Sequence, residues 1–85
     1  MDISVLKYAN FKKLEILKIH GNNISDIEVL KNVDFKELKK LDLGFNQIFD
    51  IKVLERVNFE KLEILYLDDN RISDIAVFEN VNFKE

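Results

Sequence analysis

Hydrophobic and polar positions repeat along this chain with a period of 24 residues. Residues 11–34, 35–58 and 59–82 form three full repeats, residues 1–10 match the tail of a repeat, and residues 83–85 open a further one. A phenylalanine starts each unit, at Phe11, Phe35, Phe59 and Phe83. A fixed period of this length is typical of a solenoid, in which one supersecondary unit stacks on copies of itself. We therefore expect residues 1–85 to fold as a single domain of stacked repeats.

Each repeat begins with a period of two and then changes to a period of three. In the first repeat Leu17 and Ile19 alternate with their neighbours, which predicts a short strand with one buried face. Ile27, Leu30 and Val33 then lie three apart, which predicts one or two turns of helix with an apolar stripe. Candidate N-cap residues precede this helix or its equivalents at Ser25, Asp26, Asp50 and Asp74.

Neither element can be stable alone, because a helix this short needs tertiary packing. We therefore expect neighbouring repeats to share one continuous core. Its predicted members, with their equivalents 24 and 48 residues further on, are Leu14, Leu17, Ile19, Ile24, Ile27, Leu30, Val33 and Phe35.

An asparagine follows each predicted strand at the same place in the repeat, at Asn22, Asn46 and Asn70. Each comes after an inward-facing residue, at the turn out of the strand. A buried amide there needs hydrogen-bond partners, and the free backbone groups of the turn are the natural ones. The pattern favours a structural asparagine ladder over a polar ligand site.

With these asparagines, each repeat reads LxxLxLxxNxI, as in Leu14, Leu17, Ile19, Asn22 and Ile24. This pattern resembles the leucine-rich-repeat family over nearly the whole chain. The segments ISDIEVL and ISDIAVF look like the subclass found in phosphatase regulatory subunits and bacterial internalin-like proteins. The resemblance implies an α/β right-handed solenoid, with short parallel strands on the concave side and short helices on the convex side. It also implies an internal row of phenylalanines and the binding of a protein partner through the concave face.

Two features depart from the family pattern. Phe49 replaces the serine found at positions 25 and 73, and no capping segment is visible at either end. Residues 1–9 could form a convex helix without its strand, which would cover that end only in part. The sequence therefore suggests an excerpt of a longer repeat array. The alternative is a structural fragment or designed building block that self-associates through uncapped ends.

The alternation also predicts which side chains face the concave surface. Several of them are more apolar than a solvated surface needs, which favours a protein-binding role. The same alternation places Gly44 in one column with His20 and Asp68, and places Gly21 and Asp69 beside that column with Phe45. The predicted partner-binding residues are Ile16, Lys18, His20, Lys40, Asp42, Phe45, Ile64, Tyr66 and Asp68.

Composition and charge narrow the function further. The 85 residues carry 13 basic and 16 acidic side chains, a net charge of −3, which argues against nucleic-acid binding. The net charges of the three full repeats are 0, +1 and −4, a gradient that could orient a partner. The absence of cysteine excludes disulfides and thiolate metal sites. No apolar run is long enough to span a membrane and no secretory signal is present, so we expect a cytoplasmic protein.

Candidate chemistry is sparse. His20 is the only histidine, and no serine or cysteine nucleophile joins it at a matching spacing. Asp42, Asp68 and Asp69 could approach one another around a hard cation, but no loop has the spacing of a calcium site. The sequence therefore predicts a non-enzymatic interaction module with no cofactor and no metal.

Overall fold

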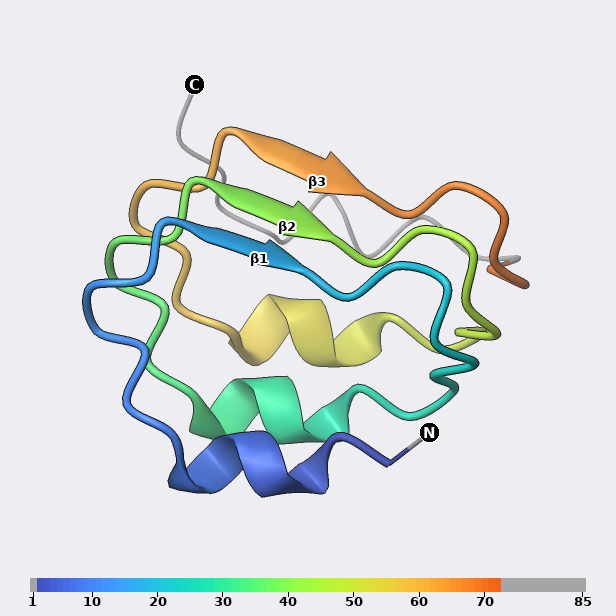
Figure 1. Cartoon of the computed structure of the whole chain (residues 1–85), viewed down its shortest axis with the longest axis horizontal. Coiled ribbons are helices and arrows are strands. Elements are labelled where there is room, and N and C mark those ends of the chain that lie inside the picture. The colour runs from blue at the N-terminus through green and yellow to red at the C-terminus, as the bar shows by residue number, and fades with distance from the viewer. Residues whose placement is uncertain (1, 73–85) are drawn as a thin grey trace.

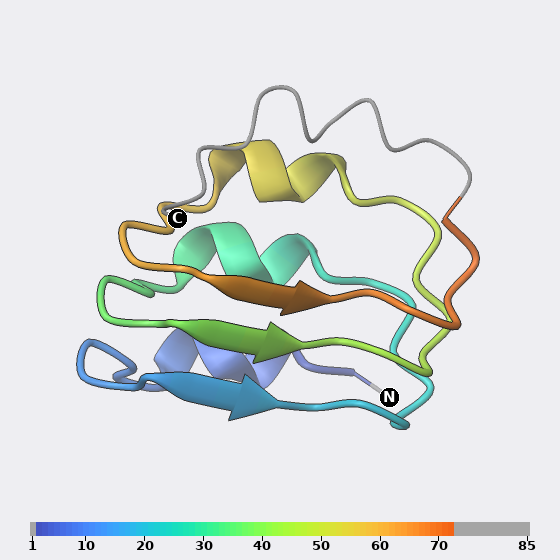
Figure 2. The same ribbon diagram turned by 90° about the horizontal axis from the view of Figure 1, so that it is seen from above.

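The computed structural model describes residues 2–72, which form two layers (Figure 1). Three strands lie in one layer and three short helices in the other, and the two kinds of element alternate along the chain. Their bounds are η1 (Ser4–Tyr8), β1 (Ile16–Lys18), η2 (Glu28–Asn32), β2 (Lys40–Asp42), η3 (Lys52–Arg56) and β3 (Ile64–Tyr66). Seen from above, the repeats stack in sequence order (Figure 2). The helix η1 lies beside η2, and within residues 2–72 no strand precedes it. The predicted solenoid of parallel strands and short helices is confirmed.

The strands form an open parallel sheet in the order β1-β2-β3. Leu17 pairs with Leu41, and Leu41 pairs with Leu65, so the register shift equals the repeat length at both junctions. Because side chains alternate between the two faces of a strand, this register places equivalent residues of all three repeats side by side. Every inward leucine therefore meets a leucine, and every outward position forms a column across the sheet.

The helices are of the 3₁₀ type and each is five residues long. At the end of η2 the N–H of Val33 donates to the carbonyl of Leu30 at 3.2 Å. Before η2, the Asp26 carboxylate accepts the N–H of Glu28 at 2.9 Å, and Asp50 accepts that of Lys52 in the same way before η3. Each aspartate thus binds one free donor at the helix start, but from the position before the N-cap, which is Ile27 in η2 and Ile51 in η3. Asp74 lies outside the described residues. The three-residue spacing of the apolar positions fits a 3₁₀ helix, in which residues i and i+3 eclipse.

The core lies between the two layers and is most complete in the middle repeat. All eight equivalents of the predicted core residues are buried there. Phe35 stacks on Phe11 and on Phe59 with ring centroids 6.1 Å apart in both pairs, which forms the expected internal phenylalanine row.

Burial is lower at the two edges of the described sheet than the sequence predicted. Leu14, Leu17 and Ile19 around β1 are only partly buried, as are Leu65 and Leu67 around β3. The physical reason is that β1 and β3 each have a neighbouring strand on one side only within residues 2–72. Full burial of these positions requires a repeat on both sides, which only the middle repeat has there.

Candidate functional site

The outward-facing side chains of the sheet form a surface that we call the strand face: the outer sides of β1, β2 and β3 and the residues directly after each strand. It corresponds to the expected concave face. The sheet register brings Ile16, Lys40 and Ile64 into one column. Lys18, Asp42 and Tyr66 form the next column. Predicted site residues from three separate repeats are thus neighbours, because each strand pairs with the next at a shift of one repeat.

Large apolar side chains on the strand face are open to solvent. Their exposed fractions are 54% for Ile16, 60% for Phe45, 42% for Ile64 and 44% for Tyr66. The ammonium of Lys40 lies 5.3 Å from the centroid of the Tyr66 ring, in the range of a cation–π contact. The strand face therefore offers two aromatic rings and two isoleucines on one side of the sheet.

At the carboxyl ends of the strands the surface is hollowed, and we call this depression the strand-end hollow. Its volume is about 280 Å³. Inside it, the Nδ1 atom of His20 lies 3.3 Å from Oδ2 of Asp42, while Oδ1 of Asp42 accepts the N–H of Gly44 at 3.0 Å. Five of the nine predicted partner-binding residues line it, namely His20, Asp42, Phe45, Tyr66 and Asp68.

Gly44 leaves room for the Asp68 carboxylate that lines this hollow, a role that the sequence did not predict. A Cβ atom at position 44 would lie 2.7 Å from Oδ1 of Asp68, which is too close for an unshifted side chain. Where Gly44 stands, the other two repeats carry His20 and Asp68. The glycine at this one strand position was the signal, but its consequence depends on where the Asp68 carboxylate lies.

The turn after each strand holds its second residue in the left-handed region. The φ angles are 70° at Gly21, 55° at Phe45 and 55° at Asp69. Glycine and aspartate tolerate this conformation, whereas for a bulky aromatic residue it is an outlier that costs on the order of 1 kcal/mol. The N–H of Phe45 donates to the carbonyl of Asp68 at 2.8 Å, so the backbone of this turn is tied to the next repeat. The exposed Phe45 ring therefore projects from a fixed position.

Asn46 connects the first two repeats through five hydrogen bonds to the backbone. Its Oδ1 atom accepts the N–H groups of Asn22 and Ile24, at 2.9 and 3.0 Å. Its Nδ2 atom donates to the carbonyls of Leu43, Gly44 and Ile19, at 2.9, 3.1 and 3.2 Å. These contacts take up the amide of this buried side chain and leave it no part in ligand binding.

Asn70 repeats the arrangement one repeat later, with its Oδ1 atom accepting the N–H of Ile48 at 2.9 Å. In Asn22 the Nδ2 atom donates in the same way, to the carbonyls of Ile19 and His20 at 2.9 Å. Asn22 differs in its Oδ1 atom, which no contact within residues 2–72 reaches.

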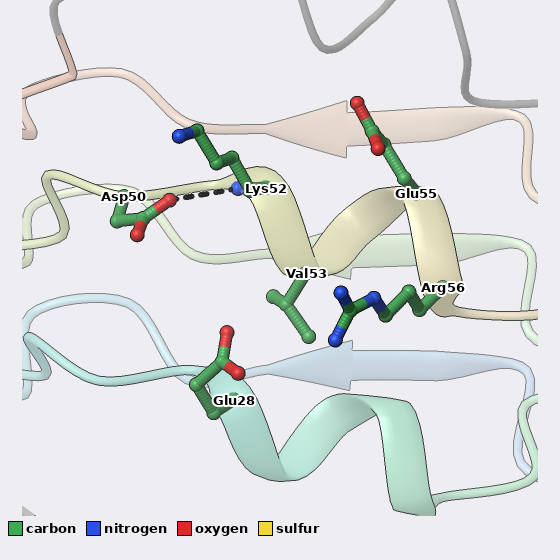
Figure 3. A pocket seen from close by; sticks show the side chains of 6 residues that line it. All are labelled: Glu28, Asp50, Lys52, Val53, Glu55 and Arg56. Carbon is green, nitrogen blue, oxygen red and sulfur yellow. Dashed lines mark hydrogen bonds between the residues drawn. The ribbon is translucent and has the colours of Figure 1, made fainter.

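The helix layer also has hollows, which the sequence did not predict. One, of about 300 Å³, lies between η2 and η3, with Val53 placed between the two helices (Figure 3). Its lining carries both signs of charge, and the Asp50 carboxylate is already bonded to the backbone of Lys52 (Figure 3). The other residues that line it are Glu28, Glu55 and Arg56. A second hollow of similar size is lined in part by Phe49, which is 65% exposed. Neither brings two aromatic rings together.

An ion pair away from both hollows links the second and third repeats. The Lys61 ammonium lies 2.9 Å from Oε1 of Glu37, and this hydrogen bond holds the pKa of Glu37 below its usual range and that of Lys61 above it. Both groups are solvated. Elsewhere, residues 2–72 contain no group of three or more metal-ligating side chains placed to hold an ion, and no helix long and apolar enough to cross a membrane.

These stacked strand–turn–helix units, with an asparagine at each turn, define a leucine-rich-repeat domain. A family model for two copies of leucine-rich repeats matches residues 36–80, and the chain belongs to this family. Domains of this family generally serve as protein–protein interaction modules and are typically not enzymes.

Among solved structures the chain is similar to an internalin (inlF) from Listeria monocytogenes, at 30% sequence identity with a TM-score of 0.58. That match covers 98% of this chain and 31% of the internalin, so the chain spans about a third of its length. A comparison with curated proteins found no match.

Proposed function

We propose that this domain binds a protein partner through its strand face, without catalysing a reaction. The observation that carries the proposal is the gathering of exposed apolar and aromatic side chains on the sheet. Ile16, Ile64, Tyr66 and Phe45 come from three different repeats and share one surface. Scattered apolar residues are normal on a protein surface, whereas a contiguous group on a rigid element is typical of an interface.

Tyr66 is the expected centre of binding. It lies on the strand face with Ile64 before it and Lys40 over its ring. Tyrosine offers a large contact area at a low cost in conformational entropy, and it is enriched among the residues that dominate interface energies. Ile64 on the same strand, and Ile16 two strands away, would extend the apolar part of the contact.

The experiment selects binders from displayed peptide and small-domain libraries against the 85-residue chain. Tyr66→Ala should then weaken the selected binders by about 2 kcal/mol, which is roughly 30-fold, and leave the melting temperature almost unchanged. Tyr8→Ala is the matched control, because Tyr8 is also exposed and has a lysine ammonium 5.1 Å from its ring centroid, but it belongs to η1 in the helix layer. Binders that tolerate Tyr66→Ala and lose affinity with Tyr8→Ala would refute the proposal.

A further inference from the structure

We propose that the strand-end hollow receives an arginine side chain of the bound protein. This inference rests on the proposed function, since the arginine belongs to a partner lying on the strand face. The hollow combines two carboxylates and two aromatic rings, with His20 beside one of the carboxylates, and this lining suits a planar cation.

The carboxylates supply the charge, and they differ in what they already bind. Asp42 accepts the N–H of Gly44 with one oxygen, and its other oxygen lies 3.3 Å from Nδ1 of His20. The Asp68 carboxylate has no ion pair or side-chain hydrogen bond among the contacts of residues 2–72. It lies beside Gly44, and Asp68 is exposed to solvent. Asp69 follows directly in sequence and adds to the negative field, in the repeat whose net charge is −4. An incoming guanidinium would find Asp68 ready to accept its hydrogen bonds.

The aromatic rings favour arginine over lysine. A guanidinium is planar and stacks on an aromatic face while its edge donates to carboxylates, whereas an ammonium is a strongly hydrated point charge. Lys40 already lies over the Tyr66 ring, which leaves the exposed Phe45 ring as the open stacking surface. Phe45 keeps this place despite its unfavourable backbone conformation, where glycine or aspartate stands in the other repeats.

The size of the hollow also suits a side chain. Its volume of about 280 Å³ lies at or below the lower end for small-molecule sites, which run from roughly 300 to 1,000 Å³. The place of the Asp68 carboxylate in its lining depends on Gly44, because a Cβ atom there would meet that carboxylate at 2.7 Å. A side chain reaching in from a partner that lies across the strands needs no deeper cavity.

The test uses two-dimensional amide NMR of the 85-residue chain titrated with N-acetyl-arginine amide. The neutral isostere N-acetyl-citrulline amide serves as the probe control. We expect saturable shifts at Gly44, Phe45 and Asp68 with the arginine compound only. Asp68→Asn should weaken binding about fivefold by removing one charge-assisted contact. Glu63→Gln, the same loss of charge just before β3 at its other end, should leave binding unchanged.

Gly44→Ala should weaken arginine binding in the same way as Asp68→Asn, because it displaces the carboxylate by filling space. Three results of the titration would overturn the proposal: equal shifts from citrulline, equal losses from the variants at positions 63 and 68, or stronger shifts of the same amides by calcium chloride. The displayed binders separate this inference from the proposed function. Binders that depend on Tyr66 but tolerate Asp68→Asn would refute the arginine site and leave the strand-face interface standing.

Discussion

Replacement of Asn46 by alanine tests whether the asparagine ladder holds the repeats together. The side chain is 7% exposed and its Oδ1 atom accepts two backbone N–H groups of the preceding repeat. Truncation to alanine removes both acceptor bonds and three donor bonds at once. The loss therefore falls on the junction between the first and second repeats, and the strand face is left chemically unaltered.

The magnitude follows from which backbone groups lose their only partner. The carbonyls of Leu43 and Ile19 keep hydrogen bonds from Asn70 and Asn22, so they lose little. The N–H of Ile24 is fully buried and would be left unsatisfied, which costs about 2 kcal/mol, and the half-buried N–H of Asn22 adds about 1 kcal/mol. We therefore expect Asn46→Ala to lower the free energy of unfolding by about 3 kcal/mol.

Asn22→Ala is the matched comparison, because it removes the same group one repeat earlier. It loses two donor bonds to carbonyls and no acceptor bond within the described residues, so we expect a cost of about 1 kcal/mol. Urea denaturation followed by circular dichroism measures both losses. Equal losses from the two variants would show that the acceptor bonds of Asn46 do not stabilise the repeat junction, and the reasoning would fail.

Three further predictions concern the core, the ion pair and the sheet edge. Leu41→Ala should lower the free energy of unfolding in urea by about 2–5 kcal/mol, because Leu41 is fully buried and its strand has a neighbour on each side. Lys40→Ala should lower it by less than about 1 kcal/mol. Equal losses would contradict the assignment of Leu41 to the core face and Lys40 to the outer face. Because the pKa of Glu37 is lowered in the folded protein, its contribution to stability is present at neutral pH and is lost as pH falls through that pKa. In Lys61→Met, NMR titration should show the pKa of Glu37 back in its usual range. An unchanged pKa would exclude the ion pair as the cause of the shift. The edge strand β1 should drive concentration-dependent self-association of the 85-residue chain in analytical ultracentrifugation, and Ile16→Lys should reduce it; a strictly monomeric species up to millimolar concentration would contradict this.

The sequence predicted burial well where its repeats have neighbours on both sides. In the middle repeat every predicted core residue is buried, from Phe35 to Val57. Around β1 the same pattern gave the wrong degree of burial for Leu17 and Ile19, because burial there depends on what stacks beside the repeat and not on its own residues. The sequence analysis predicted a short helix without naming its type. The spacing of three between apolar positions fits the three residues per turn of a 3₁₀ helix.

The candidate site was predictable in part, because the alternation of positions in each strand repeats from one unit to the next. Alternation placed Ile16, Lys40 and Ile64 on one face, and the register then made them neighbours. The hollow was not predictable, because it depends on where the Asp68 carboxylate lies beside Gly44 and on the left-handed turn that positions Phe45. These are properties of backbone geometry and of contacts between repeats, which a linear pattern does not contain.

In a stacked repeat, these two kinds of position answer to different constraints. A buried position must fit its equivalents above and below, so Leu41 cannot change without a cost to both neighbours. An outward position has no such partner and is free to differ, as Gly21, Phe45 and Asp69 do at one backbone site. Most such differences cost nothing and carry no information. Phe45 is informative because it places an exposed aromatic ring where the backbone conformation disfavours it, so neither solubility nor stability of the isolated domain explains its presence. The proposed contact of that ring with a protein partner would account for its presence at the carboxyl end of β2.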